Sequence, residues 1–161
     1  MQHFVIRPVE KHDLPLLDTA LRTLSRELGD KHPASIDFLE QAGFGPTPAY
    51  YALIALSDTD ALGGAVVFSP VMSTTLAATG FYVSDLWVAE AARGCGLGCR
   101  LLANATNFSQ ARWNASYLKL AVYDGSSGAR RFYDRLGLTA RRGETTMFLD
   151  KFGLDALKGE L

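Results

Sequence analysis

The chain has 161 residues, a formal net charge of −1, 48% hydrophobic residues and 20% charged residues. This length suits one domain with a real core, and a near-neutral chain without runs of like charge argues against a nucleic-acid surface or a polybasic membrane anchor. The N-terminus lacks the pattern of a signal peptide, and no apolar run reaches the roughly 18 residues of a membrane-spanning helix. We therefore expect a cytoplasmic protein with a single domain over residues 1–161.

The first third of the chain predicts one strand and two helices. Leucines recur at three- and four-residue steps, which indicates one apolar helix face. Asp13 suits the N-cap of this helix, Pro15 suits its first turn, and Gly29 suits its end. We expect a strand over residues 4–9 and a helix over 13–28, followed by a short helix that runs through Gln41 and is capped by Ser35 or Asp37.

The rest of the chain alternates apolar runs with turn signals. A Gly/Pro-rich loop over residues 43–48 precedes a hairpin signal at residues 57–60. The expected strands cover residues 50–56, 62–71, 79–88 and 117–123, with helices after residues 96 and 126, and a final strand pair over 138–142 and 145–151 that turns at residues 142–144. The tail over residues 152–161 suits a helical turn or an oligomer contact.

The segment Arg93-Gly94-Cys95-Gly96-Leu97-Gly98 carries the most information about function. It joins an apolar strand-like run to a helix-like run, and glycines allow a ligand to approach the backbone closely. The N–H groups and the dipole of a helix N-terminus favour an anion, and an arginine adds forked donors suited to phosphate. The spacing matches neither a mononucleotide P-loop nor the G-x-G-x-x-G fingerprint of dinucleotide-binding folds.

A second motif follows after the predicted strand over residues 117–123. It reads Ser126-Ser127-Gly128-Ala129-Arg130-Arg131-Phe132-Tyr133, and Gly137 suits the C-terminal end of the predicted helix.

Together these two motifs resemble the GNAT family of acyl-CoA-dependent N-acetyltransferases. Arg93, Gly96 and Gly98 fill the family's motif A, which is Arg or Gln, two residues, Gly, one residue, and Gly or Ala. Residues 126–133 are similar to motif B, Asn-x-x-Ala-x-x-Phe-Tyr, with Ser126 in place of the Asn. The resemblance is specific over about residues 79–138. It implies an α/β (α+β) fold with a mixed, mostly antiparallel sheet of about seven strands, flanked by helices and splayed at its two central strands.

The resemblance also implies acetyl-CoA as co-substrate, with no metal. In the family, the loop amides hold the pyrophosphate of coenzyme A, and the pantetheine lies between two splayed strands. The residues implied in cofactor binding are Leu86, Trp87, Val88, Arg93, Gly94, Cys95, Gly96, Leu97, Gly98, Ser126 and Ala129. For Arg130 and Arg131, contact with the adenosine 3′-phosphate and a solvated helix face both remain open.

Tyr133 and Asp85 are the catalytic candidates. Tyr133 matches the family tyrosine that protonates the departing thiolate, and a phenol with a reference pKa of about 10 stays protonated at pH 7. Alkyl amines arrive mostly protonated, so a carboxylate or an ordered water chain must accept a proton. For Asp85, on the strand before the loop, direct acceptance, relay through water and binding of a cationic substrate all remain open. The competing interpretations are a core tyrosine and an aspartate that caps a backbone bulge.

Cys95 and Cys99 are too few for a zinc site. Their simplest interpretation is as small residues around a ligand loop. The alternative is a redox-sensitive thiol, because a helix N-terminus lowers a thiol pKa.

We therefore predict an N-acetyltransferase that moves an acetyl group from acetyl-CoA to a small cationic amine by direct attack in a ternary complex. The segment over residues 82–137 is most similar to the diamine, polyamine and thialysine acetyltransferases. A mildly acidic rim suits a cation: Asp37, Glu40, Asp58, Asp60 and Asp85. An amino acid, a drug or a protein N-terminus as acceptor remains open, as does an acyl-CoA-binding module of weak activity. A homodimer is common in the family.

Overall fold

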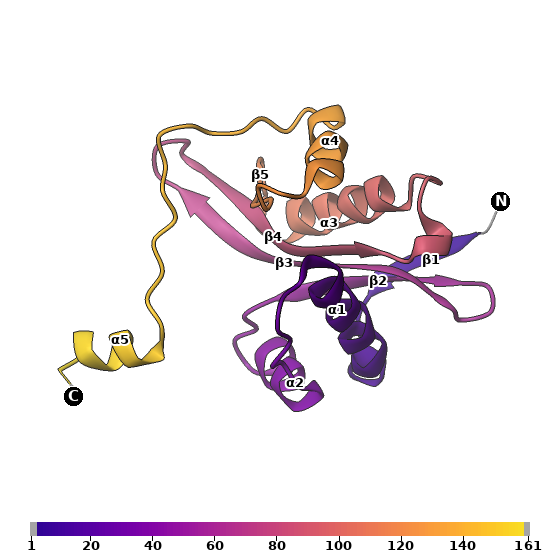
Figure 1. Ribbon diagram of the computed structural model, residues 1–161, viewed down its shortest axis with the longest axis horizontal. Coiled ribbons are helices and arrows are strands. Elements are labelled where there is room, and N and C mark those ends of the chain that lie inside the picture. Colours follow the sequence, from indigo (N-terminus) through magenta and orange to yellow (C-terminus); the bar gives the residue numbers. More distant parts are fainter. Residues whose placement is uncertain (1–2, 160–161) are drawn as a thin grey trace. The chain divides into compact units, whose positions relative to one another are not determined.

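The computed structural model describes residues 3–159, and the chain divides into two units, residues 1–121 and residues 122–161 (Figure 1). The strands, all in the first unit, are β1 (Phe4–Pro8), β2 (Tyr51–Ser57), β3 (Leu62–Ser73), β4 (Ala78–Val88) and β5 (Leu118–Leu120). The helices of this unit are α1 (Leu14–Leu28), α2 (Ile36–Phe44) and α3 (Leu97–Trp113), with 3-10 turns at Lys11–Asp13 and Glu90–Ala92. The second unit holds α4 (Ser127–Arg135) and α5 (Lys151–Leu157). Within residues 3–159, no helix combines the length and apolarity that a bilayer crossing requires.

One mixed sheet organises the first unit. Its strand order is β1-β2-β3-β4-β5, with antiparallel pairing from β1 to β4 and parallel pairing between β4 and β5. Parallel neighbours need a crossover connection, and α3 supplies it. The predicted α/β fold with a mixed, mostly antiparallel sheet is confirmed, with five strands within residues 3–159 in place of about seven.

Helices cover both faces of this sheet (Figure 1). On one face, Leu14 and Leu17 of α1 share a buried cluster with Trp87 of β4. On the other face, the ring of Phe108 in α3 meets that of Phe68 in β3 at a centroid distance of 5.5 Å. Each buried side chain of this size contributes about 1.5–3 kcal/mol, so the leucine spacing seen in the sequence is what holds α1 to the sheet.

The pairing between β4 and β5 is short and ends at a definite point. It joins Phe81–Val83 to Leu118–Leu120. On the β3 side, the register skips Ser84, because Val67 faces Asp85 while Phe68 faces Val83. Such a bulge bends a strand and increases its twist. Beyond Val83, β4 therefore pairs in the first unit with β3 alone, which is the splay that the fold class predicts.

The predicted strand over residues 117–123 is shorter than expected, with strand pairing over residues 118–120 only. The chain turns soon afterwards, because the N–H of Ser126 donates to the carbonyl of Tyr123 at 2.9 Å. A local turn of this kind uses backbone groups that a longer ladder would need.

The predicted final strand pair, over residues 138–142 and 145–151, is wrong: neither segment forms a strand. Gly143 has the positive φ of a turn, +87°. However, two strands alone are only marginally stable, and the predicted strand over residues 138–142 offers only Leu138 and Ala140 to a core. Asp150 instead caps α5, because its Oδ1 accepts the N–H of Gly153 at 2.9 Å. The expected helical turn in the tail is confirmed as α5.

Candidate active site

The glycine-rich loop lies between β4 and α3, as predicted. Gly94 and Gly96 have φ values of +76° and +78°, in the left-handed region that other residues rarely adopt. Gly96 immediately precedes Leu97, the first residue of α3. Because Gly94 and Gly96 have no side chains, neither residue covers the N-terminus of α3.

The backbone N–H groups of this loop are available to a ligand. Within residues 3–159, no N–H from residues 94–99 donates to a backbone carbonyl, and the N–H of Arg100 is the next to do so, to Gly96 at 3.1 Å. The first N–H groups of a helix lack intrahelical partners and carry the positive end of its dipole. The loop therefore has the donor set of an anion site.

The two cysteines of this region are free thiols with exposed positions. The Sγ of Cys95 donates to the carbonyl of Ala92 at 2.8 Å. The redox hypothesis for Cys95 and Cys99 stays a prediction.

Arg93 is held by two protein groups. Its Nε donates to the carbonyl oxygen of Val88 at 3.0 Å, and its Nη2 lies 2.9 Å from both carboxylate oxygens of Glu27 in α1. The arginine predicted to meet phosphate is thus also bound to the end of β4 and to α1.

The open edge of β4 leads directly to this loop. The N–H of Ala89 donates to Gly63 at the β3 side, and peptide groups alternate along a strand. The N–H and C=O of Leu86 and Val88 therefore face the open edge, whereas those of Trp87 face β3. This favours Leu86 and Val88 over Trp87 as backbone partners of a bound chain.

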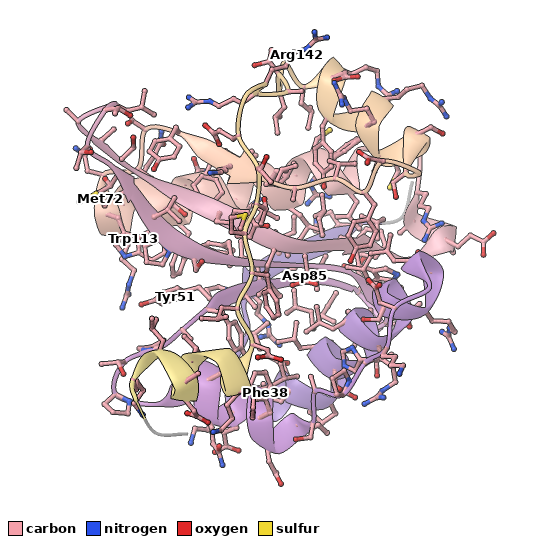
Figure 2. The ribbon with its side chains drawn as sticks, turned by 60° about the vertical axis from the view of Figure 1, so that its left-hand side comes forward. Phe38, Tyr51, Met72, Asp85, Trp113 and Arg142 are labelled. Atoms are coloured by element: carbon pink, nitrogen blue, oxygen red, sulfur yellow. The ribbon has the colours of Figure 1, made fainter. Side chains whose placement is uncertain are left out.

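Asp85 belongs to the face of the sheet that α1 and α2 cover. It alternates with Trp87, which is buried against these helices, and Figure 2 shows it on that side, with Phe38 of α2 farther out. The Oδ2 of Asp85 accepts a hydrogen bond from the hydroxyl of Ser84 at 2.7 Å. Asp85 thus stands beside the bulge, and its carboxylate remains partly exposed.

Tyr133 lies on α4 in the second unit. It is half-buried, and its ring meets that of Phe132 at a centroid distance of 5.1 Å. Burial raises the pKa of Tyr133 above its ordinary value of 10.0, because a phenolate would be poorly solvated there. The phenol is therefore a proton donor throughout the neutral range.

The remaining motif B residues form the start and end of α4. Ser126 is the N-cap, but its hydroxyl makes no capping bond, and Ala129 lies on the exposed first turn. Gly137 ends the helix as predicted, with φ of +86°, and the N–H of Leu138 donates to Tyr133 at 3.1 Å.

Two residues of the first unit were missed by sequence reasoning. Glu27 binds Arg93 from the last turn of α1, where a negative charge opposes the helix dipole. That unfavourable position was the one signal available. The hydroxyl of Tyr50 donates to the carbonyl of Leu39 in α2 at 2.8 Å, and burial raises the pKa of Tyr50 to about 12.

The loop and the fold together define an anion-binding α/β protein in which unpaired amides, left-handed glycines and a helix N-terminus suit a pyrophosphate. The acetyltransferase (GNAT) family model matches residues 17–138. The chain therefore belongs to the GNAT family and is an acyl-CoA-dependent N-acetyltransferase. This family uses acetyl-CoA as co-substrate.

Relatives agree with this assignment. A thialysine N-ε-acetyltransferase of Bos taurus is 28% identical over 145 residues, which cover 85% of each chain. Among solved structures, an integron cassette protein of V. cholerae has a TM-score of 0.76 at 22% identity and covers 96% of this chain and 97% of its own. A ribosomal-protein-alanine N-acetyltransferase from Brucella melitensis biovar Abortus has a TM-score of 0.73 at 18% identity, with coverages of 91% and 100%. These structural likenesses show the fold.

Proposed function

We propose that this acetyltransferase acts on a small cationic primary amine, within a single domain that spans residues 1–161. The observation that carries the proposal is the position of Asp85, a partly exposed carboxylate beside the open edge of β4 and on the α1/α2 face. A carboxylate at this place suits an acceptor that arrives with a positive charge and must lose a proton.

Acidic side chains on α2 add to this support. Asp37 and Glu40 line a hollow of about 270 Å³ together with Lys11, Gln41, Phe44 and Gly45. Lys11 neutralises part of this charge, because its Nζ lies 2.9 Å from an oxygen of Glu40. Asp58 is less suited, since it pairs with His3 at 3.3 Å. Glu40 and Asp58 are thus paired, and Asp37, Asp60 and Asp85 are the members of the acidic rim that have no ion-pair partner among residues 3–159.

The bovine relative, by its name, acetylates the ε-nitrogen of thialysine. At 28% identity, it supports an amine acceptor of this general kind for this chain.

The chain's own residues supply the remaining chemistry. Acetyl-CoA brings the acetyl thioester. The N–H groups of residues 94–98, with Arg93, bind the pyrophosphate, and Ser126 and Ala129 begin the second cofactor-binding segment. The Leu86 N–H, on the open edge of β4, donates to the acetyl oxygen as negative charge develops there, and one such donor lowers a barrier by about 2.7–4 kcal/mol.

Three proton transfers complete the proposal. Asp85 accepts a proton from the ammonium group, directly or through water, and passes it to solvent, so that the neutral nitrogen attacks the thioester carbon. Tyr133 donates its phenolic proton to the departing thiolate as the carbon–sulfur bond breaks. The nitrogen releases its second proton as the amide forms, and exchange through water returns a proton to the Tyr133 phenolate. The raised pKa of Tyr133 keeps that proton in place until it is needed.

The test is thiol release from acetyl-CoA across putrescine, spermidine, lysine analogues, free amino acids and short peptides. We expect turnover with diamines, polyamines or thialysine, and loss of that turnover in Asp85→Asn. A preference for the α-amines of free amino acids or for peptide N-termini would contradict the cationic-amine proposal.

Tyr133→Phe separates an enzyme from an acyl-CoA-binding module. We expect it to bind acetyl-CoA normally while kcat falls by roughly 10²–10⁴-fold, the usual contribution of a positioned proton donor. Unchanged turnover would show that Tyr133 is not the acid.

A further inference from the structure

The ion pair between Glu27 and Arg93 joins two distant parts of the first unit. Glu27 lies in the last turn of α1, and Arg93 begins the glycine-rich loop 66 residues later. The Nη2 atom lies 2.9 Å from both carboxylate oxygens, and the side chains are 48% and 41% exposed for Arg93 and Glu27. A carboxylate at a helix C-terminus opposes the helix dipole, so the pairing compensates an otherwise unfavourable position.

The same guanidinium also closes the turn between β4 and the loop. Its Nε donates to the Val88 carbonyl at 3.0 Å, across the 3-10 turn Glu90–Ala92. Because the carbonyl of Val88 faces the open edge of β4, the hydrogen bond from Arg93 occupies the last carbonyl on that edge. Leu86 is then the nearest residue of the edge with both its N–H and its C=O left for a ligand.

Nη1 is the guanidinium nitrogen left over. Within residues 3–159, it donates to no protein group, whereas Nε and Nη2 are both engaged. A guanidinium fixed at two nitrogens loses little further freedom when its third nitrogen binds an anion.

We propose that Glu27 is a positioning residue for the cofactor: it holds Arg93 against Val88, which fixes the start of the glycine-rich loop and leaves Nη1 for a phosphate oxygen. This inference rests on the proposed binding of acetyl-CoA at the loop. Glu27 touches neither the acceptor nor the reacting atoms in this scheme, and it acts only through Arg93.

The test compares Glu27→Ala with the unaltered protein by calorimetric titration with acetyl-CoA and by steady-state kinetics. An exposed or half-exposed pair is worth up to about 1 kcal/mol, so we expect the Kd and KM for acetyl-CoA to rise roughly three- to fivefold. The value of kcat should stay within about twofold. Glu27→Gln should recover most of the affinity, because its amide oxygen still accepts from Nη2.

A substrate without phosphate distinguishes positioning from general damage. S-acetylpantetheine carries the thioester but no pyrophosphate, so its kcat/KM should be the same in Glu27→Ala and in the unaltered protein. A double-mutant cycle supplies the second readout: Glu27→Ala should add nothing to the effect of Arg93→Ala, since the two residues act as one unit.

Glu90→Ala is the matched control, because it removes a carboxylate three residues before Arg93 that forms no ion pair within residues 3–159. It should leave acetyl-CoA affinity unchanged. The inference would be overturned, while the proposed function stands, if Glu27→Ala bound acetyl-CoA as tightly as the unaltered protein or more tightly. The same holds if Glu27→Ala lost as much kcat/KM with S-acetylpantetheine as with acetyl-CoA. If the unaltered protein fails to bind acetyl-CoA, the proposed function fails with it.

Discussion

At the scale of single residues, the buried carboxylate of Asp13 is the most constrained charge of the first unit. Its side chain is 3% exposed, and it accepts from Arg7 Nη1 at 2.6 Å and Nη2 at 2.8 Å. It also accepts the backbone N–H of Glu10 at 2.8 Å. These donors hold the pKa of Asp13 below its ordinary value of 3.8, and the hydrogen bonds from Arg7 have the largest effect.

This shift predicts a specific acid sensitivity. The unfolded chain binds a proton at Asp13 more readily than the folded protein, so stability from this group is complete above pH 3.8 and falls as the pH drops toward the lower folded pKa. Asp13→Asn should lower the free energy of unfolding at pH 7 by about 3 kcal/mol, the lower end of the range for a broken buried pair, because Arg7 is one-third exposed. Its stability should also depend less on pH below 3.8 than that of the unaltered protein.

Urea unfolding at a series of pH values provides the measurement. Asp58→Asn is the matched control, since Asp58 pairs with His3 at the surface with a side chain 73% exposed. The assignment to Asp13 is wrong if both variants lose stability equally. It is also wrong if the free energy of unfolding of Asp13→Asn falls below pH 3.8 as steeply as that of the unaltered protein.

At the scale of elements, the loop before α3 depends on backbone conformation more than on side chains. A Cβ added at Gly96 would meet no atom within 4 Å, so only its φ of +78° disfavours another residue. Gly96→Ala should strain the loop by roughly 1–2 kcal/mol and tilt the N–H groups of residues 94–98 away from an anion. We expect the Kd for acetyl-CoA to rise about tenfold, as measured by titration.

Gly143→Ala controls for strain alone. Gly143 has a similar φ of +87° and the same open space, but it lies in the second unit outside both motifs. It should show comparable strain with no effect on acetyl-CoA binding. Weakened binding in both variants would mean that the Gly96 effect is not local.

Elements with their own local signals were predictable from sequence. α1 has a leucine face and Gly29 at its end, and the strand–glycine–helix order located the anion loop without any long-range information. The family resemblance rested on the same short segments, which is why the fold class is confirmed although the strand count is not.

Features that depend on distant partners were not predictable. The Glu27–Arg93 pair joins residues far apart in sequence. A bulge beside Asp85 was an open interpretation of the sequence, but its place at Ser84 depends on the register with β3. The prediction of a final strand pair was wrong for a related reason. A strand needs a neighbouring strand to pair with, and the pattern of residues 145–149 does not show whether such a strand is present. The predicted roles of Asp85 and Tyr133 stay predictions.

At the scale of the whole molecule, the second unit taken by itself leaves several large apolar side chains exposed. Met147 and Phe148 are 87% and 88% exposed, and Phe152 and Leu157 of the α5 region are 70% and 77% exposed. Large apolar side chains exposed within one short segment favour association with a partner surface. The second copy of the chain is the partner we propose, because one apolar segment repeated about a two-fold axis meets itself.

This proposal predicts a homodimer that depends on residues 147–148. Light scattering after gel filtration should give twice the chain mass of 17.5 kDa for the unaltered protein and one chain mass for the double variant Met147→Ser/Phe148→Ser. The control is Met72→Ser, which removes another exposed methionine, 70% exposed, from β3 of the first unit, and this variant should stay dimeric. Burial of one Met or Phe side chain contributes roughly 1.5–3 kcal/mol, so the loss of both should raise the Kd of the dimer by two orders of magnitude or more. A monomeric unaltered protein at micromolar concentration would contradict the proposal, and a dimeric double variant would move the interface elsewhere.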